Sequence, residues 1–61
     1  MEKIFKFVYY NKIYLVEMLH HKLLISDEAG IQLYQIPIES AENEKDPLIK
    51  FAFRVYKTLI A

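Results

Sequence analysis

Residues 46–61 read DPLIKFAFRVYKTLIA, and this stretch decides the fold class. Asp46 offers a side-chain oxygen that can cap a helix N-terminus, and Pro47 suits the first helical position because its missing N–H needs no partner there. Neither glycine nor a further proline interrupts the residues that follow. The pattern predicts one C-terminal helix over about residues 47–60.

Upstream of this helix, the composition is that of β-strands. Four segments are rich in β-branched and aromatic residues: 3–10, 13–19, 22–26 and 31–38. Pro37 cannot donate a ladder hydrogen bond, so the last strand is predicted at a sheet edge, and residues 39–45 form a charged connector. We therefore predict a single α+β domain, residues 1–61, in which an antiparallel meander of three to four strands precedes one C-terminal helix.

Three turns are predicted between the strands. Residues 11–12 are short enough for a two-residue hairpin loop, a bend is expected at residues 20–21, and residues 27–30 place Asp first and Gly last, as a type I turn prefers. The first loop puts Lys6 opposite Glu17, an opposite-charge pair across the two strands. Both faces of that hairpin are rich in apolar side chains, so neither is suited to open water.

The size of the chain leaves little room for a core. A chain of 61 residues buries only about 60% of its unfolded surface, and without cysteine no disulfide can compensate. Its formal net charge is zero, although residues 27–46 carry six acids and one lysine whereas residues 47–61 carry three cations and no acid. Zero net charge disfavours a general nucleic-acid binder. The absence of a long apolar run and of a signal-peptide pattern predicts a cytoplasmic protein.

Nothing in the sequence predicts catalysis, a cofactor or a bound metal. With no cysteine and one glycine, the chain lacks a thiol nucleophile and a glycine-rich phosphate loop. His20 and His21 are the only histidines, and on a strand they would point to opposite faces, away from a shared ion. Ser26 beside Asp27 is interpreted as local backbone capping. We expect no enzymatic activity.

The apolar residues of the predicted helix extend too far around it for one sheet to cover. They occupy an arc of roughly 200°, whereas a helix lying on one sheet needs a stripe of a little over 100°. Leu48, Phe51, Ala52, Val55 and Leu59 already provide that stripe. The surplus residues are Ile49, Phe53, Tyr56 and Ile60.

We expect these four residues, joined by side chains from the second sheet face, to contact another copy of the chain. The prediction is a small non-enzymatic interaction domain, a regulatory, inhibitory or assembly factor that acts through protein–protein contacts as a homodimer, with a further protein partner that the sequence does not identify. The rival interpretation is a monomer whose sheet curls around both sides of the helix.

Two other functions remain open at this point. Residues 3–10 overlap the strand pattern of RNA-recognition domains, in which aromatic side chains stack on bases. A nucleic-acid surface would use the cations of that strand or of the basic helix face: Lys3, Lys6, Lys50, Arg54 and Lys57. The same helix, with cations beside a broad apolar face, is the basis of the second alternative, an amphipathic helix that associates with a membrane surface.

Overall fold

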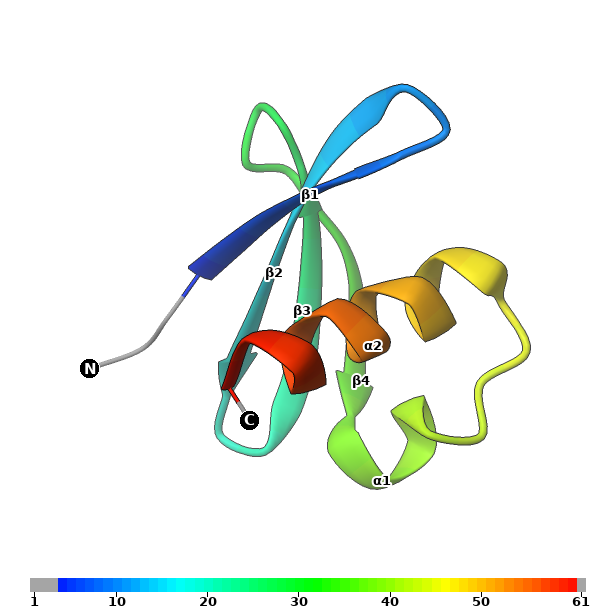
Figure 1. Cartoon of the computed structure of the whole chain (residues 1–61). Helices are drawn as coiled ribbons and strands as arrows, with labels where there is room; N and C mark the ends of the chain where they lie inside the picture. Colours follow the sequence, from blue (N-terminus) through cyan, green and yellow to red (C-terminus); the bar gives the residue numbers. More distant parts are fainter. Residues whose placement is uncertain (1–3, 61) are drawn as a thin grey trace.

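Four antiparallel strands, paired in chain order, form one sheet in the computed structural model, which describes residues 4–60 and the side chains of residues 4–59. The strands are β1 (Ile4–Tyr9), β2 (Lys12–Leu19), β3 (Lys22–Asp27) and β4 (Gln32–Pro37). A short helix, α1 (Ile38–Ala41), follows β4, and α2 (Pro47–Ile60) then crosses one face of the sheet (Figure 1). The predicted α+β meander with a C-terminal helix is confirmed, as is the edge position of the strand that contains Pro37.

Two tight turns with left-handed backbone connect the first three strands. Tyr10 and Asn11 have φ angles of 50° and 64°, and His20 and His21 have φ angles of 52° and 63°. Positive φ at both central residues is what a type I′ hairpin turn requires, and this turn matches the right-handed twist of the strands. Both loops are therefore two residues long, but the first comprises residues 10–11 rather than the predicted 11–12.

This difference in the first turn changes the register of β1 against β2. Lys6 pairs with Leu15 and Ile4 pairs with Glu17, so the predicted direct pairing of Lys6 with Glu17 is wrong by two residues. The physical reason is that Asn11 takes the second left-handed position, which leaves Lys12 in ordinary extended strand geometry. Because the shift is two residues, every side chain stays on its predicted face.

The core lies between the sheet and the two helices. Its buried residues are Phe7, Val16, Leu23, Ile25, Ala41, Ile49 and Ala52. Ile49 has only 4% of its surface exposed, so its assignment to a free flank of the helix is wrong. The reason is α1, which forms where only a connector was predicted and places Ala41 in the same cluster, so that this flank of α2 is covered. Leu59, which was expected to face the sheet, is instead 51% exposed.

The carboxylates of Asp46 and Asp27 accept backbone hydrogen bonds at the start of α2 and in the β3–β4 turn. The Leu48 N–H donates to Asp46 Oδ1 at 2.9 Å, which confirms the predicted helix cap, and the Tyr34 hydroxyl donates to Asp46 Oδ2 at 3.1 Å. The cap residue thus also ties the start of α2 to β4. In the β3–β4 turn, the Ile31 N–H donates to Asp27 Oδ1 at 2.9 Å, and Gly30 has a φ of 90°, a conformation that glycine adopts without steric cost.

Candidate interaction surface

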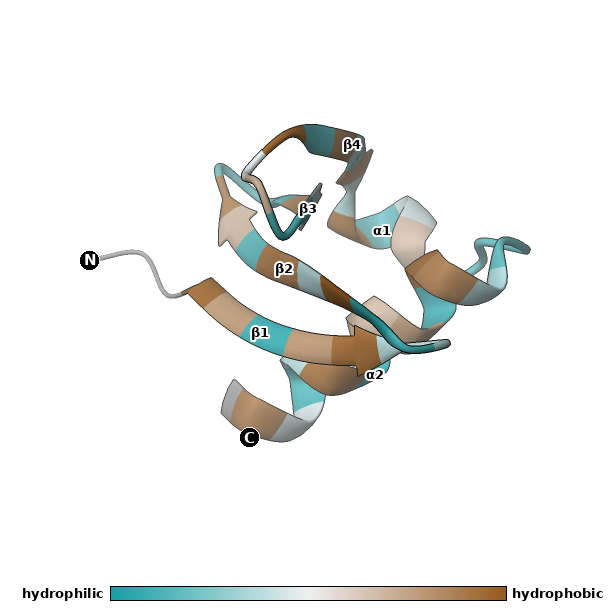
Figure 2. Ribbon diagram, turned by 90° about the horizontal axis from the view of Figure 1, so that it is seen from above, coloured by the Kyte–Doolittle hydropathy of each residue, from teal (hydrophilic) through white to brown (hydrophobic). Residues whose placement is uncertain are grey.

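One face of the sheet carries apolar side chains that no helix covers. Partners in an antiparallel ladder share a face, so the pairs Val8–Ile13, Lys6–Leu15 and Ile4–Glu17 lie on one face, opposite to the core residues. Figure 2 shows α2 on one side only of the β1–β2 ribbon. We call the uncovered side the open face and define it by its apolar members: Ile4, Val8, Ile13, Leu15, Leu19 and Leu24.

The exposure of these residues rises toward the outer strand. Ile4 is 59% exposed and Val8 is 60% exposed, both on the edge strand β1, whereas their neighbours on β2 are half-buried. Leu24 on β3 is only 8% exposed although it lies outside the core cluster, so its neighbours on the open face cover it. A projecting edge and a recessed centre therefore lie side by side on this surface.

A hollow of about 180 Å³ marks the recessed centre. Leu15 and Leu24 lie in its lining together with Ile4, Glu17 and Gly30. The lining of the hollow is about as polar as it is apolar, with Glu17 and Ser26 beside the aliphatic side chains. An aliphatic side chain of a partner could contact Ile4, Leu15 and Leu24 there and so lose contact with water.

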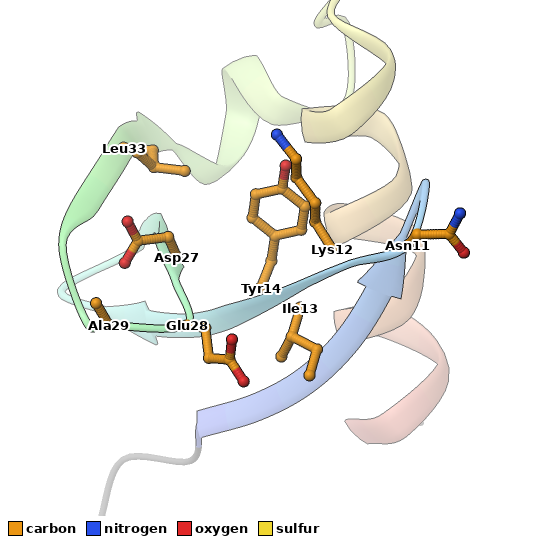
Figure 3. Close-up of a pocket in the computed structure, with 8 residues that line it drawn as sticks. All are labelled: Asn11, Lys12, Ile13, Tyr14, Asp27, Glu28, Ala29 and Leu33. Carbon is orange, nitrogen blue, oxygen red and sulfur yellow. The ribbon is translucent and has the colours of Figure 1, made fainter.

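A larger groove of about 590 Å³ lies at another corner of the sheet (Figure 3). Lys12 and Tyr14 point in the same direction from β2, and Leu33 lies across the groove from them, whereas Asn11 points away. Asp27, also in the lining, accepts the Ile31 N–H and so serves the turn. Catalytic groups, and the polar groups of a small-molecule site, converge on one point. The polar groups of this groove are instead spread around an open rim.

The predicted helix residues have separate positions in the structure. Tyr56 packs edge-on against Phe5, with ring centroids 6.1 Å apart, and the Lys57 Nζ lies 4.9 Å from the centroid of the Phe53 ring. Phe53 and Tyr56 are both half-buried within the chain, Ile49 is in the core, and the side chain of Ile60 lies outside the described residues. The three surplus residues whose side chains the structure describes, Ile49, Phe53 and Tyr56, are thus mostly covered by the chain itself.

The cations proposed for nucleic acid do not form a single surface. Lys6 lies on the open face, Lys50 and Arg54 are exposed on α2 across the sheet from it, and Lys3 lies outside the described residues. The aromatic residues of β1 face the core: Phe7 is buried, 5.6 Å from Phe51 between ring centroids. Stacking of bases on these rings would require α2 to leave the sheet.

Comparison with known proteins does not supply a function. No family model, curated protein or solved structure matches this chain.

Among residues 4–60, no group of three or more His, Asp or Glu side chains is placed to hold a metal ion, and His20 and His21 are exposed in a turn. In the same part of the chain, no helix has the length and apolar character needed to cross a membrane. The interpretation therefore depends on the open face and its chemistry.

The sequence indicated the open face only in part. Both faces of the predicted β1–β2 hairpin are rich in apolar residues, and this pattern indicated that the face away from the helix would also be apolar. The hollow was missed because it depends on the approach of the Gly30 loop to β2 and β3, a contact between residues distant in the sequence.

Proposed function

We propose that this chain is a small non-enzymatic interaction domain that acts through protein–protein contacts, and that it uses the open face to form a homodimer. The observation that supports the proposal is the exposure of Ile4 and Val8 beside half-buried apolar residues of β2. An antiparallel sheet that faces water normally alternates apolar residues inside with polar residues outside. Here the outside is also apolar over the β1–β2 half of the sheet.

The gain from covering this surface is comparable to the cost of association. Burying a large aliphatic side chain stabilises by about 1.5–3 kcal/mol, so the exposed fractions of Ile4 and Val8 in two copies contribute roughly 4–7 kcal/mol. The cost of association is about 4–15 kcal/mol. The remaining surface of Ile13, Leu15 and Leu19 must therefore be buried as well for a dimer to form.

The size of the sheet predicts a weak dimer. Six-residue strands extend about 20 Å and four strands are about 19 Å wide, which gives roughly 400 Å² per copy and 800 Å² in total. Stable complexes bury about 1,200–2,000 Å². We therefore expect a dissociation constant in the micromolar range or weaker, and a mass that depends on concentration.

Sedimentation equilibrium over a wide concentration range, up to several hundred micromolar, tests the proposal. The wild-type chain should pass from monomer to dimer, and Val8→Lys should remain monomeric. Leu59→Lys is the matched control, because Leu59 has similar exposure but lies on α2, across the sheet from the open face. A wild-type chain that stays monomeric throughout would refute the proposal, and loss of the dimer in Leu59→Lys alone would assign the contact to the helix.

The other predicted functions receive less support. A nucleic-acid surface would have to use either Lys6 or the helix cations Lys50, Arg54 and Lys57, since the sheet separates them. A membrane surface would compete with the sheet for the apolar stripe of α2, which includes the buried Ala52. An electrophoretic shift that weakens steeply with salt would favour the first alternative, and flotation with anionic vesicles would favour the second. Cytoplasmic location stays a prediction.

A further inference from the structure

The open face carries one cation and one anion in a defined arrangement. Lys6 pairs with Leu15, and Ile4 pairs with Glu17 in the same two strands. Paired Cα atoms lie about 5 Å apart and alternate residues along a strand lie about 6.6 Å apart. The four residues therefore occupy the corners of a rectangle, with Lys6 and Glu17 about 8 Å apart on one diagonal and Ile4 and Leu15 on the other.

We propose that two copies pack open face to open face about a two-fold axis that crosses the midpoint of the Lys6–Glu17 diagonal at right angles and runs close to Ile4 and Leu15, so that Lys6 of each copy meets Glu17 of the other. This arrangement rests on the proposed homodimer and specifies its contacts. A two-fold interface uses the same surface twice, so any contact of residue i with residue j is repeated as j with i. An axis that bisects a diagonal at right angles exchanges the two ends of that diagonal, and it therefore forms both ion pairs at once.

The apolar groups fit the same axis. Ile4 and Leu15 lie close to the axis, so each approaches its own equivalent in the second copy. On the idealised spacing of the sheet, Val8 lies above Leu24 of the second copy, within about 2 Å in the plane of the sheet. Val8 projects from the edge strand and Leu24 lines the 180 Å³ hollow, so a projecting side chain meets a recess.

The angle between the two sheets follows from the axis. The axis makes an angle of about 53° with the strands, so the strands of the two copies cross at about 105°, or about 75° measured as the acute angle. Sheets pack face to face in two classes, one aligned at about 30° and one orthogonal at about 90°. The proposed dimer belongs to the orthogonal class.

The charges on the open face favour a second copy of this chain over a partner whose surface is only basic or only acidic. A basic surface would place a like charge against Lys6, and an acidic surface would place one against Glu17, and like charges held together oppose association. A second copy related by this axis presents Glu17 to Lys6 and Lys6 to Glu17. The surface of this chain is therefore electrostatically complementary to itself.

Charge reversal tests the ion pairs. Lys6→Glu and Glu17→Lys should each weaken the homodimer roughly tenfold, because two attractive pairs become two repulsive ones. An equimolar mixture of the two variants should associate at least as tightly as the wild type, since all contacts between them are attractive. The double variant Lys6→Glu, Glu17→Lys should regain the wild-type dissociation constant. Thermal melting of each variant shows whether the monomer fold is retained.

Crosslinking tests the axis independently of charge. The chain has no cysteine, so a single introduced thiol reports one position. Ile4→Cys and Leu15→Cys should each give a covalent dimer with a short bis-maleimide crosslinker. Val8→Cys should not, because the two copies of Val8 lie about 19 Å apart in the plane of the sheet.

The outcomes separate this arrangement from the function on which it rests. A dimer that persists after both charge reversals and crosslinks at Val8→Cys instead would overturn the axis and leave the interaction function standing. A wild-type chain that is monomeric at all concentrations would overturn both.

Discussion

Replacing Tyr10 with asparagine should stabilise the protein, because Tyr10 holds an unfavourable backbone conformation. Its φ is 50°, and a left-handed residue costs roughly 1–2 kcal/mol for most side chains, whereas asparagine adopts this conformation much more readily. The substitution also removes the contact of the Tyr10 ring with Tyr9, whose centroids lie 4.6 Å apart. Tyr10 is 83% exposed, so that contact contributes about 0.5 kcal/mol, the low end for aromatic pairs.

The net gain for Tyr10→Asn is therefore about 0.5–1.5 kcal/mol. For a domain of this size, 1 kcal/mol shifts Tm by about 4–8 °C, so the change is measurable by thermal melting followed by circular dichroism. Protein concentration must be equal in all samples, since a dimer makes Tm depend on it. Tyr10→Ala is the matched control, because alanine loses the ring contact while keeping the strain. If Tyr10→Asn is no more stable than Tyr10→Ala, the strain argument is wrong.

Three further changes probe the rest of the fold. Asp46→Ala should destabilise by about 1 kcal/mol through loss of the cap on the Leu48 N–H, and Asp46→Asn should keep most of it, as urea unfolding would show. Ile25→Ala should cost about 2–5 kcal/mol, because Ile25 is fully buried, and in so small a domain a loss of that size should leave much of the chain unfolded at room temperature. The hydrogen bond to Asp46 and the charge of its carboxylate raise the pKa of Tyr34. The resulting stability is complete below about pH 10 and is lost as the pH rises through the higher folded pKa, so Tyr34→Phe should flatten the alkaline decline of the free energy of unfolding.

The fold could be predicted because its strands and main helix are marked by local signals. The Asp46-Pro47 pair identifies the start of α2, and the cap bond to Leu48 is the interaction that this pair predicts. The β3–β4 turn was likewise found from Asp27 and Gly30, whose roles are local. Each of these features depends on neighbours within a few residues of sequence.

The sequence predictions were wrong where the local structure depends on contacts between residues distant in the sequence or on backbone strain. The first turn places Tyr10 in a conformation that tyrosine disfavours, so turn preferences gave a register two residues away. The helix α1 is four residues long, begins after Pro37 and has no side-chain cap, so no local signal marks it. Its Ala41 belongs to the same buried cluster as Ile49, and a helical wheel alone cannot show which flank a separate element will cover.

The burial of Ile49 changes where a partner surface must be sought. The excess of apolar residues on α2 predicted a dimer through the helix, yet the chain itself buries Ile49 and half-buries Phe53 and Tyr56. The composition of the open face is uneven: the β3–β4 half presents Lys22, Ser26 and Gln35 around Leu24, while the β1–β2 half presents Val8 and Ile13 around Lys6 and Glu17.

On the proposed axis, Val8 and Ile13 of one copy lie over the β3–β4 half of the other, where Leu24 supplies apolar surface. Replacing both Val8 and Ile13 with threonine should therefore keep the strands, since threonine is also β-branched, and should weaken the dimer. Sedimentation should show the loss while circular dichroism stays unchanged. Lys22→Ala is the control on the same face, and it should leave the mass distribution close to that of the wild type, because on the idealised sheet spacing Lys22 lies beyond the edge of the second copy.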